Sequence, residues 1–104
     1  MTGTREVPVD VREETHYRLI LFVAGEEPNS RAARRNLAEI CENELHGRCD
    51  VQVVDVLEDF TAAAEHNVLV TPTLLVVEPD PKLTIVGNLS NHAKVRSALR
   101  LESS

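Results

Sequence analysis

Residues 71–86 read TPTLLVVEPDPKLTIV and contain two apolar runs that are separated by a turn. The first run, residues 73–78, and the second, residues 83–86, have lengths typical of β-strands. Pro79 and Pro81 lie between the runs. Both prolines fix the backbone φ angle and cannot donate amide hydrogen bonds, which is typical of a rigid turn. We therefore predict two antiparallel strands joined by a short hairpin.

A strand, a helix and a second strand are predicted before this hairpin. Residues 17–23 (YRLILFV) are apolar at nearly every position, which is typical of a central strand that is covered on both faces. Residues 51–56 (VQVVDV) predict a second strand. A helix between two such strands requires a right-handed crossover and therefore parallel pairing. Residues 58–66, with three consecutive alanines, predict a short second helix.

Helix-start residues precede the first and last predicted helices. Asn29 or Ser30 can cap the first helix, and Ser90 can cap the last one. The apolar stripe of the first helix consists of Leu37, Ile40, Cys41 and Leu45. The apolar side of the last helix consists of Val95, Ala98, Leu99 and Leu101.

The predicted order of elements is β-α-β-α-β-β-α, which describes a thioredoxin-like α/β sheet with helices on both faces. We expect one domain over residues 17–102, because the chain is long enough for one domain and too short for two. The preceding residues, 1–16, are polar and without periodicity, which predicts a flexible leader.

The composition disfavours several classes of partner. The chain has 104 residues, with 11 Lys and Arg against 17 Asp and Glu, and its net charge is -6. Nucleic acids and anionic membrane surfaces require a concentrated positive field, so we expect neither as a partner. No apolar run approaches the ~20 residues of a membrane span. Residues 1–16 lack an export-signal pattern, so we expect a cytoplasmic protein.

Redox catalysis is disfavoured at the start of the first helix, where thioredoxin-like redox proteins keep a reactive thiol. Residues 25–30 read GEEPNS, without cysteine, and the two glutamates would oppose a thiolate. Cys41 fits the apolar stripe as a small hydrophobic residue. Cys49 has no activating neighbour, and a Cys41–Cys49 bridge is conceivable but has no geometric support in the sequence. The alternative is a degenerate thioredoxin or glutathione-transferase-like redox protein that uses Ser30 or Cys49.

Nothing in the sequence predicts a metal or nucleotide site. The four histidines occur singly, without the spacing of a metal site, and no Gly-rich phosphate loop is present. We therefore expect no metal, no cofactor and no enzymatic activity. Thr71-Pro72 before an apolar strand resembles the cis-proline turn of thioredoxin-like proteins. Because the sequence has no thiol at the position opposite this turn, we expect the turn to have a structural role. It sets the direction in which the third strand runs.

Several segments together resemble the KaiB family of bacterial circadian-clock proteins. The chain aligns with that family without gaps from about Tyr17 to Leu101. Each segment alone is weak evidence for the family, whereas the combination of the segments is specific to it. The segments are LFVAG at 21–25 with PNS at 28–30, VDVL at 54–57, VTPTL at 70–74 and GNLSN at 87–91.

This resemblance implies a non-catalytic protein that binds a KaiC-family hexameric ATPase and regulates its phosphorylation or signalling state. It also implies KaiA or a clock histidine kinase as further partners. A stand-alone sensory domain that pairs with a histidine kinase is an open alternative, and so is a role in stress response instead of timing. Family members switch between a tetrameric ground-state fold and a monomeric thioredoxin-like fold, in which the C-terminal half differs.

The last predicted helix departs from the family pattern. Clock members typically read Gly-Leu-Asp where this chain reads Ala98-Leu99-Arg100. Ala is a better helix former than Gly by about 0.8–1 kcal/mol, and a cation is favoured near a helix C-terminus. We therefore expect Ala98 and Arg100 to favour the thioredoxin-like state and a monomer, with a tetramer possible in the alternative fold.

A second departure concerns the predicted interface. At positions where clock members tend to carry basic residues, this chain has Gln52, Glu58 and Asn67. Together with Arg34 and Arg35 of the first helix, these are the partner-binding residues that we predict. If the family's lysines contact the ATPase, this chain binds a divergent ATPase or binds more weakly.

Overall fold

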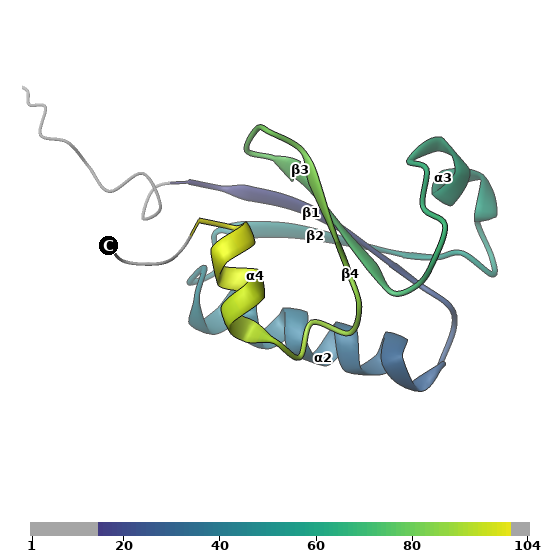
Figure 1. Ribbon diagram of the computed structural model, residues 1–104, viewed down its shortest axis with the longest axis horizontal. Coiled ribbons are helices and arrows are strands. Elements are labelled where there is room, and N and C mark those ends of the chain that lie inside the picture. The colour runs from purple at the N-terminus through teal and green to yellow at the C-terminus, as the bar shows by residue number, and fades with distance from the viewer. Residues whose placement is uncertain (1–14, 101–104) are drawn as a thin grey trace, which may run out of the picture.

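The computed structural model describes residues 15–100, in which a four-stranded sheet packs against three helices (Figure 1). The sheet has the strand order β2-β1-β3-β4, so β1 is a central strand as predicted. β1 pairs with β2 in parallel and with β3 antiparallel, and β3 pairs with β4 antiparallel. The chain runs through β1 (Tyr17–Val23), α2 (Pro28–Asn43), β2 (Cys49–Asp55), α3 (Phe60–Glu65), β3 (Thr73–Glu78), β4 (Leu83–Val86) and α4 (His92–Ala98). The predicted thioredoxin-like order is confirmed.

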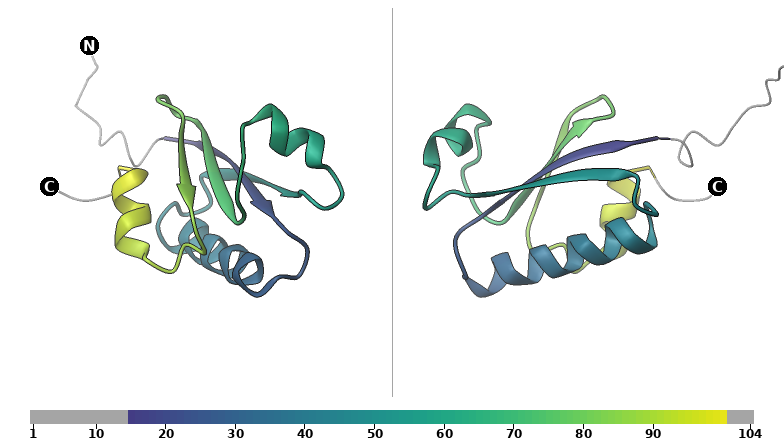
Figure 2. Two further views of the ribbon diagram at one scale, coloured as in Figure 1. Left: turned by 45° about the vertical axis from the view of Figure 1, so that its right-hand side comes forward. Right: turned by 180° about the vertical axis from the view of Figure 1, so that it is seen from behind.

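The helices divide between the two faces of the sheet (Figure 2). α2 and α4 cover one face, where alternate side chains of β1, among them Leu19 and Leu21, pack with Leu37 and Val95 of the helices. α3 covers the opposite face, where the fully buried Phe22 packs with Ala63. The residues of β1 alternate between the two faces because successive side chains in a strand point in opposite directions. This alternation explains why the whole strand is apolar.

The first helix begins earlier than the sequence predicted. Glu27, and not Asn29 or Ser30, is its cap, because the Glu27 carboxylate accepts the Ser30 amide at 2.9 Å. Pro28 occupies the first helical position, where a missing amide donor has no cost. Ser30 lies in the first turn with its side chain buried, and its Oγ accepts the Ala24 amide at 3.0 Å.

Other boundaries also differ from the predictions. β2 begins at Cys49, two residues before the predicted start, and α3 is shorter than predicted, with Asp59 as its cap. Asn91 replaces Ser90 as the cap of α4, since its Oδ1 accepts the Lys94 amide at 3.1 Å. Residues 1–14 of the predicted leader and residues 101–102 of the predicted domain lie outside the described part of the chain.

Candidate functional site

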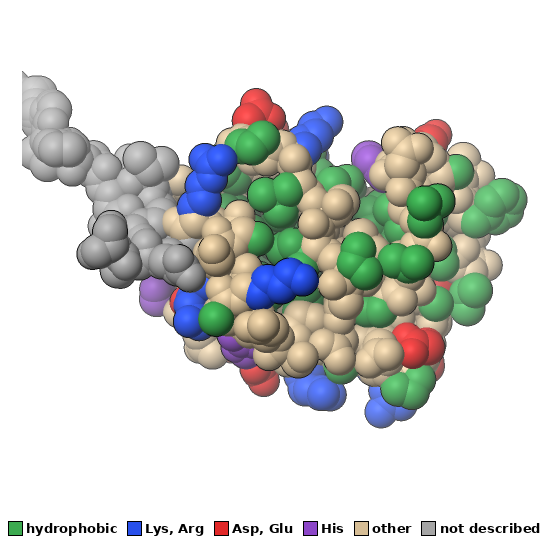
Figure 3. Space-filling view, in the orientation of Figure 1, with side chains coloured by type: hydrophobic (Ala, Val, Ile, Leu, Met, Phe, Trp, Pro, Cys, Tyr) green, Lys and Arg blue, Asp and Glu red, His purple; other side chains and the backbone are tan. Residues whose placement is uncertain are grey.

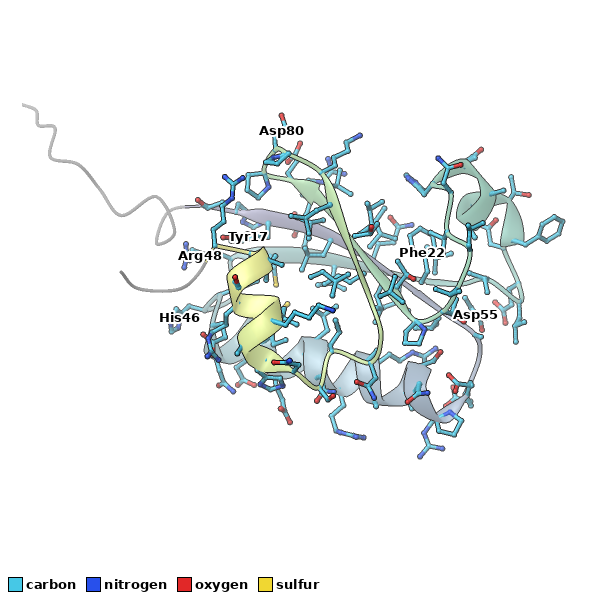
Figure 4. The ribbon with its side chains drawn as sticks, in the orientation of Figure 1. Tyr17, Phe22, His46, Arg48, Asp55 and Asp80 are labelled. Atoms are coloured by element: carbon cyan, nitrogen blue, oxygen red, sulfur yellow. The ribbon has the colours of Figure 1, made fainter. Side chains whose placement is uncertain are left out.

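Two connecting loops meet at the end of the sheet that lies opposite Tyr17 (Figure 4). Asp55, the last residue of β2, holds them together: its Oδ1 accepts the Gly25 amide and the Leu57 amide, each at 3.0 Å. Leu57 lies close to the β1–α2 loop, because a Cβ added to Gly25 would lie 3.2 Å from Leu57 Cδ1. Gly25 also has a φ of 53°, which favours glycine. Asp55 therefore fixes the β1–α2 loop and the β2–α3 loop relative to each other.

Five large apolar side chains at this end of the molecule are more than half exposed, and we call them the apolar patch. Hydrophobic side chains gather over α3 and the adjoining loops in Figure 3. An exposed apolar cluster of this kind is typical of an interaction site. The members of the apolar patch are Leu57 (73% exposed), Phe60 (74%), Leu69 (92%), Val70 (52%) and Val86 (57%).

The loop before β3 presents part of the apolar patch. The Thr71–Pro72 peptide bond is cis, and the Pro72 carbonyl accepts the Gly87 amide at 2.9 Å. The buried Thr73 donates from its Oγ1 to the Val70 carbonyl at 2.7 Å. The first hydrogen bond joins the loop to the end of β4, and the second lies within the loop, while the Leu69 and Val70 side chains are exposed.

Three of the predicted interface residues lie near α3. Glu58 and Asn67 flank the two ends of this helix and are exposed. Gln52 is exposed on the edge strand β2, where it lines a cleft together with Arg18 and His66. Gln52 lies two residues before Val54, which packs with Ala63 of α3, so both side chains share the face of the sheet that α3 covers. These three residues border the side of the domain that carries the apolar patch.

The two predicted arginines belong to α2, which covers the opposite face. Arg34 Nη1 lies 3.3 Å from Glu26 Oε2, and Arg34 Nη2 donates to the Gly25 carbonyl at 3.5 Å. Arg34 thereby supports the β1–α2 loop, whereas Arg35 is exposed. The structure therefore does not bring the five predicted residues into one cluster, since Arg34 and Arg35 lie on a helix that covers the face of the sheet opposite Gln52 and α3.

The apolar patch was missed by sequence reasoning, although a signal for it exists. Leu57, Leu69 and Val70 are large apolar residues that fall between the predicted strands and helices, where no apolar periodicity accounts for them. Apolar residues in connecting loops have to be covered by another element or remain exposed. In this domain α3 has six residues and does not cover them.

An apolar groove of about 660 Å³ lies between α2 and the edge strand β2. Cys41 and Cys49 are both half-buried and both line it, beside Val51 and Val53. Burial, and then the neighbouring Cys49 thiol, raise the pKa of Cys41 above its ordinary value. Ser30, the other residue of the alternative redox hypothesis, is fully buried and hydrogen-bonded, so it cannot meet a substrate in this conformation.

Residues 15–100 hold no group of three or more His, Cys, Asp or Glu side chains that could bind a metal ion. In the same residues no helix is long and apolar enough to cross a membrane. At the C-terminal end of the described chain, Ala98 is the last residue of α4 and Leu99 is its cap. Arg100 lies beyond the helix with a φ of 61°, and its amide donates to the Ser97 carbonyl at 3.1 Å.

A model of the KaiB domain family matches residues 20–101. The circadian clock oscillator protein KaiB of Prochlorococcus marinus (strain MIT 9312) is 45% identical over 85 residues, which cover 82% of this chain and 81% of that protein. The protein of the same name from Trichodesmium erythraeum (strain IMS101) is 44% identical over 85 residues and covers 82% of each chain.

Two solved structures illustrate the fold. The N-terminal domain of Synechococcus elongatus SasA superposes with a TM-score of 0.67 at 20% identity and covers 98% of both chains. Fasciola hepatica thioredoxin superposes with a TM-score of 0.67 at 19% identity and covers 88% of both chains. At these identities the likeness concerns the fold alone, which is thioredoxin-like.

Proposed function

The chain belongs to the KaiB family of circadian-clock proteins, and from this premise we propose that it is a non-catalytic module that binds a KaiC-family hexameric ATPase and regulates its phosphorylation or signalling state. The observation that carries the proposal is the apolar patch at the α3 end of the domain. Its five members are between 52% and 92% exposed, and such side chains are stabilised when a partner covers them.

Polar and acidic residues surround the apolar patch. Glu58 and Asp59 precede α3, Glu65 ends it and Asn67 follows it, and all four are exposed. An apolar centre with a polar rim is the usual anatomy of a protein–protein interface. Because this rim is acidic, the complementary surface of the ATPase is expected to carry Lys or Arg opposite α3. Gln52, Glu58 and Asn67 are thus proposed rim contacts.

Arg34 and Arg35 are proposed to act differently from the rim residues. Arg34 supports the β1–α2 loop through Glu26 and the Gly25 carbonyl, so it acts on the interface through that loop. Arg35 is exposed on the opposite face and is available to a second partner, for which KaiA and a clock histidine kinase are the proposed classes. We propose that the free chain is a monomer in the thioredoxin-like state, with Ala98 and Arg100 favouring α4.

The decisive experiment measures binding to the KaiC-like ATPase of the same organism by size-exclusion chromatography with light scattering, with and without ATP. The free chain is expected to elute as a monomer and to co-elute with the hexamer when mixed. Phe60→Ala and Leu69→Ser remove exposed apolar contacts, and each is expected to weaken binding about tenfold or more. Val53→Ser is the matched control, because Val53 is 49% exposed on the opposite face of the sheet.

Each result has a definite meaning. Failure to bind under every nucleotide condition would contradict the ATPase as partner. Equal loss in Val53→Ser and in the variants of the apolar patch would contradict the patch as the docking site. A free tetramer would leave the family unchanged and contradict the proposed role of Ala98 and Arg100. Normal binding by Arg35→Ala, together with weakened binding by Glu58→Lys, would assign the ATPase to the α3 side.

A further inference from the structure

Cys41 and Cys49 are brought to the same groove by a short turn. Cys41 lies in the last turn of α2, and Cys49 is the first residue of β2. The Gly47 amide donates to the Cys41 carbonyl at 3.1 Å, and the Arg48 amide donates to the Leu45 carbonyl at 2.8 Å. At the other end of the segment that joins the two cysteines, Cys49 of β2 is paired with Tyr17 of the central strand β1. Backbone hydrogen bonds therefore fix both ends of the segment that joins the two cysteines.

The surroundings of the two thiols are mainly apolar. Both cysteines pack against the larger hydrophobic core and line the groove of about 660 Å³. His46, which lies in the turn after α2 (Figure 4), lines the same groove, and so does Glu42 beside Cys41. Burial and contact with the Cys49 thiol raise the pKa of Cys41, so this thiol stays protonated at neutral pH. Cys49 is consequently the cysteine expected to react first.

We propose that Cys41 and Cys49 form a reversible intramolecular disulfide across the α2–β2 groove when the protein meets a hydroperoxide. This is a modification site on the face of the sheet opposite the apolar patch, and it does not depend on the proposed ATPase. Its basis is that the fold places two free cysteines side by side at the wall of one open groove.

The chemistry requires one hydroperoxide and proceeds in two steps. The Cys49 thiolate attacks one peroxide oxygen, the O–O bond breaks, and Cys49 becomes a sulfenic acid while water or an alcohol leaves. The Cys41 sulfur then attacks the Cys49 sulfur, the S–O bond breaks, and a second water leaves with the Cys41 proton. Two thiols lose two electrons and two protons, and the peroxide gains them. A dithiol reductant reverses the reaction by exchange.

The first test exposes the reduced full-length chain to a small excess of hydrogen peroxide, then alkylates the remaining thiols and measures the intact mass. The proposal expects a monomer that has lost two hydrogens, with both thiols lost together and both recovered after dithiothreitol. Addition of oxygen without loss of hydrogen would overturn it. Disulfide-linked dimers in place of the bridged monomer would also overturn it.

Two variants identify the order of the steps. In Cys41→Ser, peroxide is expected to leave an added oxygen on Cys49 that a sulfenic-acid reagent traps. In Cys49→Ser, Cys41 is expected to react at least about tenfold more slowly, since burial still raises the pKa of its thiol. Equal rates in the two variants would overturn the assignment of Cys49 as the first thiol.

A third measurement shows whether the fold brings the thiols together, and it uses the unaltered chain. The fraction of protein with the Cys41–Cys49 disulfide is measured in glutathione redox buffers, both in water and in concentrated urea. This fraction gives the effective concentration of one thiol relative to the other. An effective concentration at least about tenfold higher in the folded state supports the proposal. An equal or lower value in the folded state overturns it, because a seven-residue spacing alone would then explain any bridge.

Discussion

The two faces of the sheet are covered very unequally. On one face, α2 and α4 together with alternate strand residues form a core cluster of fourteen buried side chains. On the other face, α3 has six residues and the buried cluster contains only Phe22, Val54, Ala63 and Leu75. The exposed side chains of the apolar patch lie around this smaller cluster. The comparison suggests that the α2–α4 face supplies most of the stability, while the α3 end is left open for recognition.

Adjacent residues of β3 give the most direct way to test this comparison. Leu74 is fully buried and belongs to the large cluster, whereas Leu75 is 8% exposed and belongs to the small one. Leu-to-Ala changes in a core cost about 2–5 kcal/mol of unfolding free energy, according to how far the site can relax. Leu74→Ala is expected near the upper end of that range and Leu75→Ala near the lower end.

Urea unfolding followed by circular dichroism measures both variants under one set of conditions. The two residues share a strand and differ by one position, so β-propensity and the unfolded state are matched between them. A larger loss in Leu75→Ala than in Leu74→Ala would show that the small cluster is the more important one. That result would contradict the view that the α2–α4 face supplies most of the stability and that the α3 end serves recognition.

Asp55 provides the second test, because it connects the stable sheet to the loops of the open end. Asp55→Ala leaves the Gly25 and Leu57 amides without their shared acceptor, which is expected to cost about 1–3 kcal/mol. Hydrogen exchange at these two amides should accelerate more than exchange in α2. The matched control is Asp50→Ala on the same strand, where the carboxylate is 74% exposed and its Oδ2 lies 3.1 Å from Nε2 of the exposed His16.

An effect of Asp50→Ala below about 0.5 kcal/mol is expected, since exposed ion pairs contribute little. If the control variant destabilised the protein as much as Asp55→Ala, the loop connection would have no special role. If Asp55→Ala changed stability without changing exchange at Gly25 and Leu57, the two loops would be held by other contacts.

The bounds of β1, β3 and β4 were predicted correctly because each strand is a mostly apolar run that Gly or Pro follows within two residues. The helix caps were predicted less well. Asn29, Ser30 and Glu27 can all cap a helix, and the sequence does not show which backbone amide lies within reach of which side chain. In the folded chain Pro28 takes the first helical position, and this makes Glu27 the cap.

The candidate site was only partly predictable, for a different reason. Gln52, Glu58 and Asn67 were assigned by position, and they lie near the open end. Whether an apolar residue in a loop is covered depends on how far its neighbours extend, and the periodicity does not encode that. The exposure of Leu69, which is 92%, follows from the shortness of α3 and the path of the loop before Pro72.

Tyr17 tests how firmly α4 is attached to the large cluster. The Tyr17 hydroxyl donates to the Leu99 carbonyl at 2.8 Å, and both residues are buried. Tyr17→Phe keeps the ring and removes the donor, so the expected loss is about 0.5–1.5 kcal/mol. Hydrogen exchange should accelerate in α4 and remain unchanged in α3, because α3 packs on the other face. Acceleration in α3 alone would contradict the attachment of α4 through Tyr17.

Glu27 gives the smallest expected effect, which depends on pH and concerns the start of α2. Hydrogen bonds from the backbone amides of Asn29 and Ser30 lower the pKa of the Glu27 carboxyl in the folded protein. A lowered folded-state pKa means that the unfolded chain binds the proton more tightly. The contribution of Glu27 to stability is therefore fully present above the unfolded-state pKa of about 4.3 and is lost as the pH falls through the lower folded-state value.

The measurement compares the thermal unfolding midpoints of the natural chain and Glu27→Gln between neutral pH and about pH 3. The natural chain is expected to be the more stable above about pH 5, and the difference should shrink as the pH falls below the unfolded-state pKa of about 4.3. High salt serves as the control, because hydrogen bonds to the carboxylate persist when long-range charge effects are screened. A difference that grows toward acidic pH would contradict the cap.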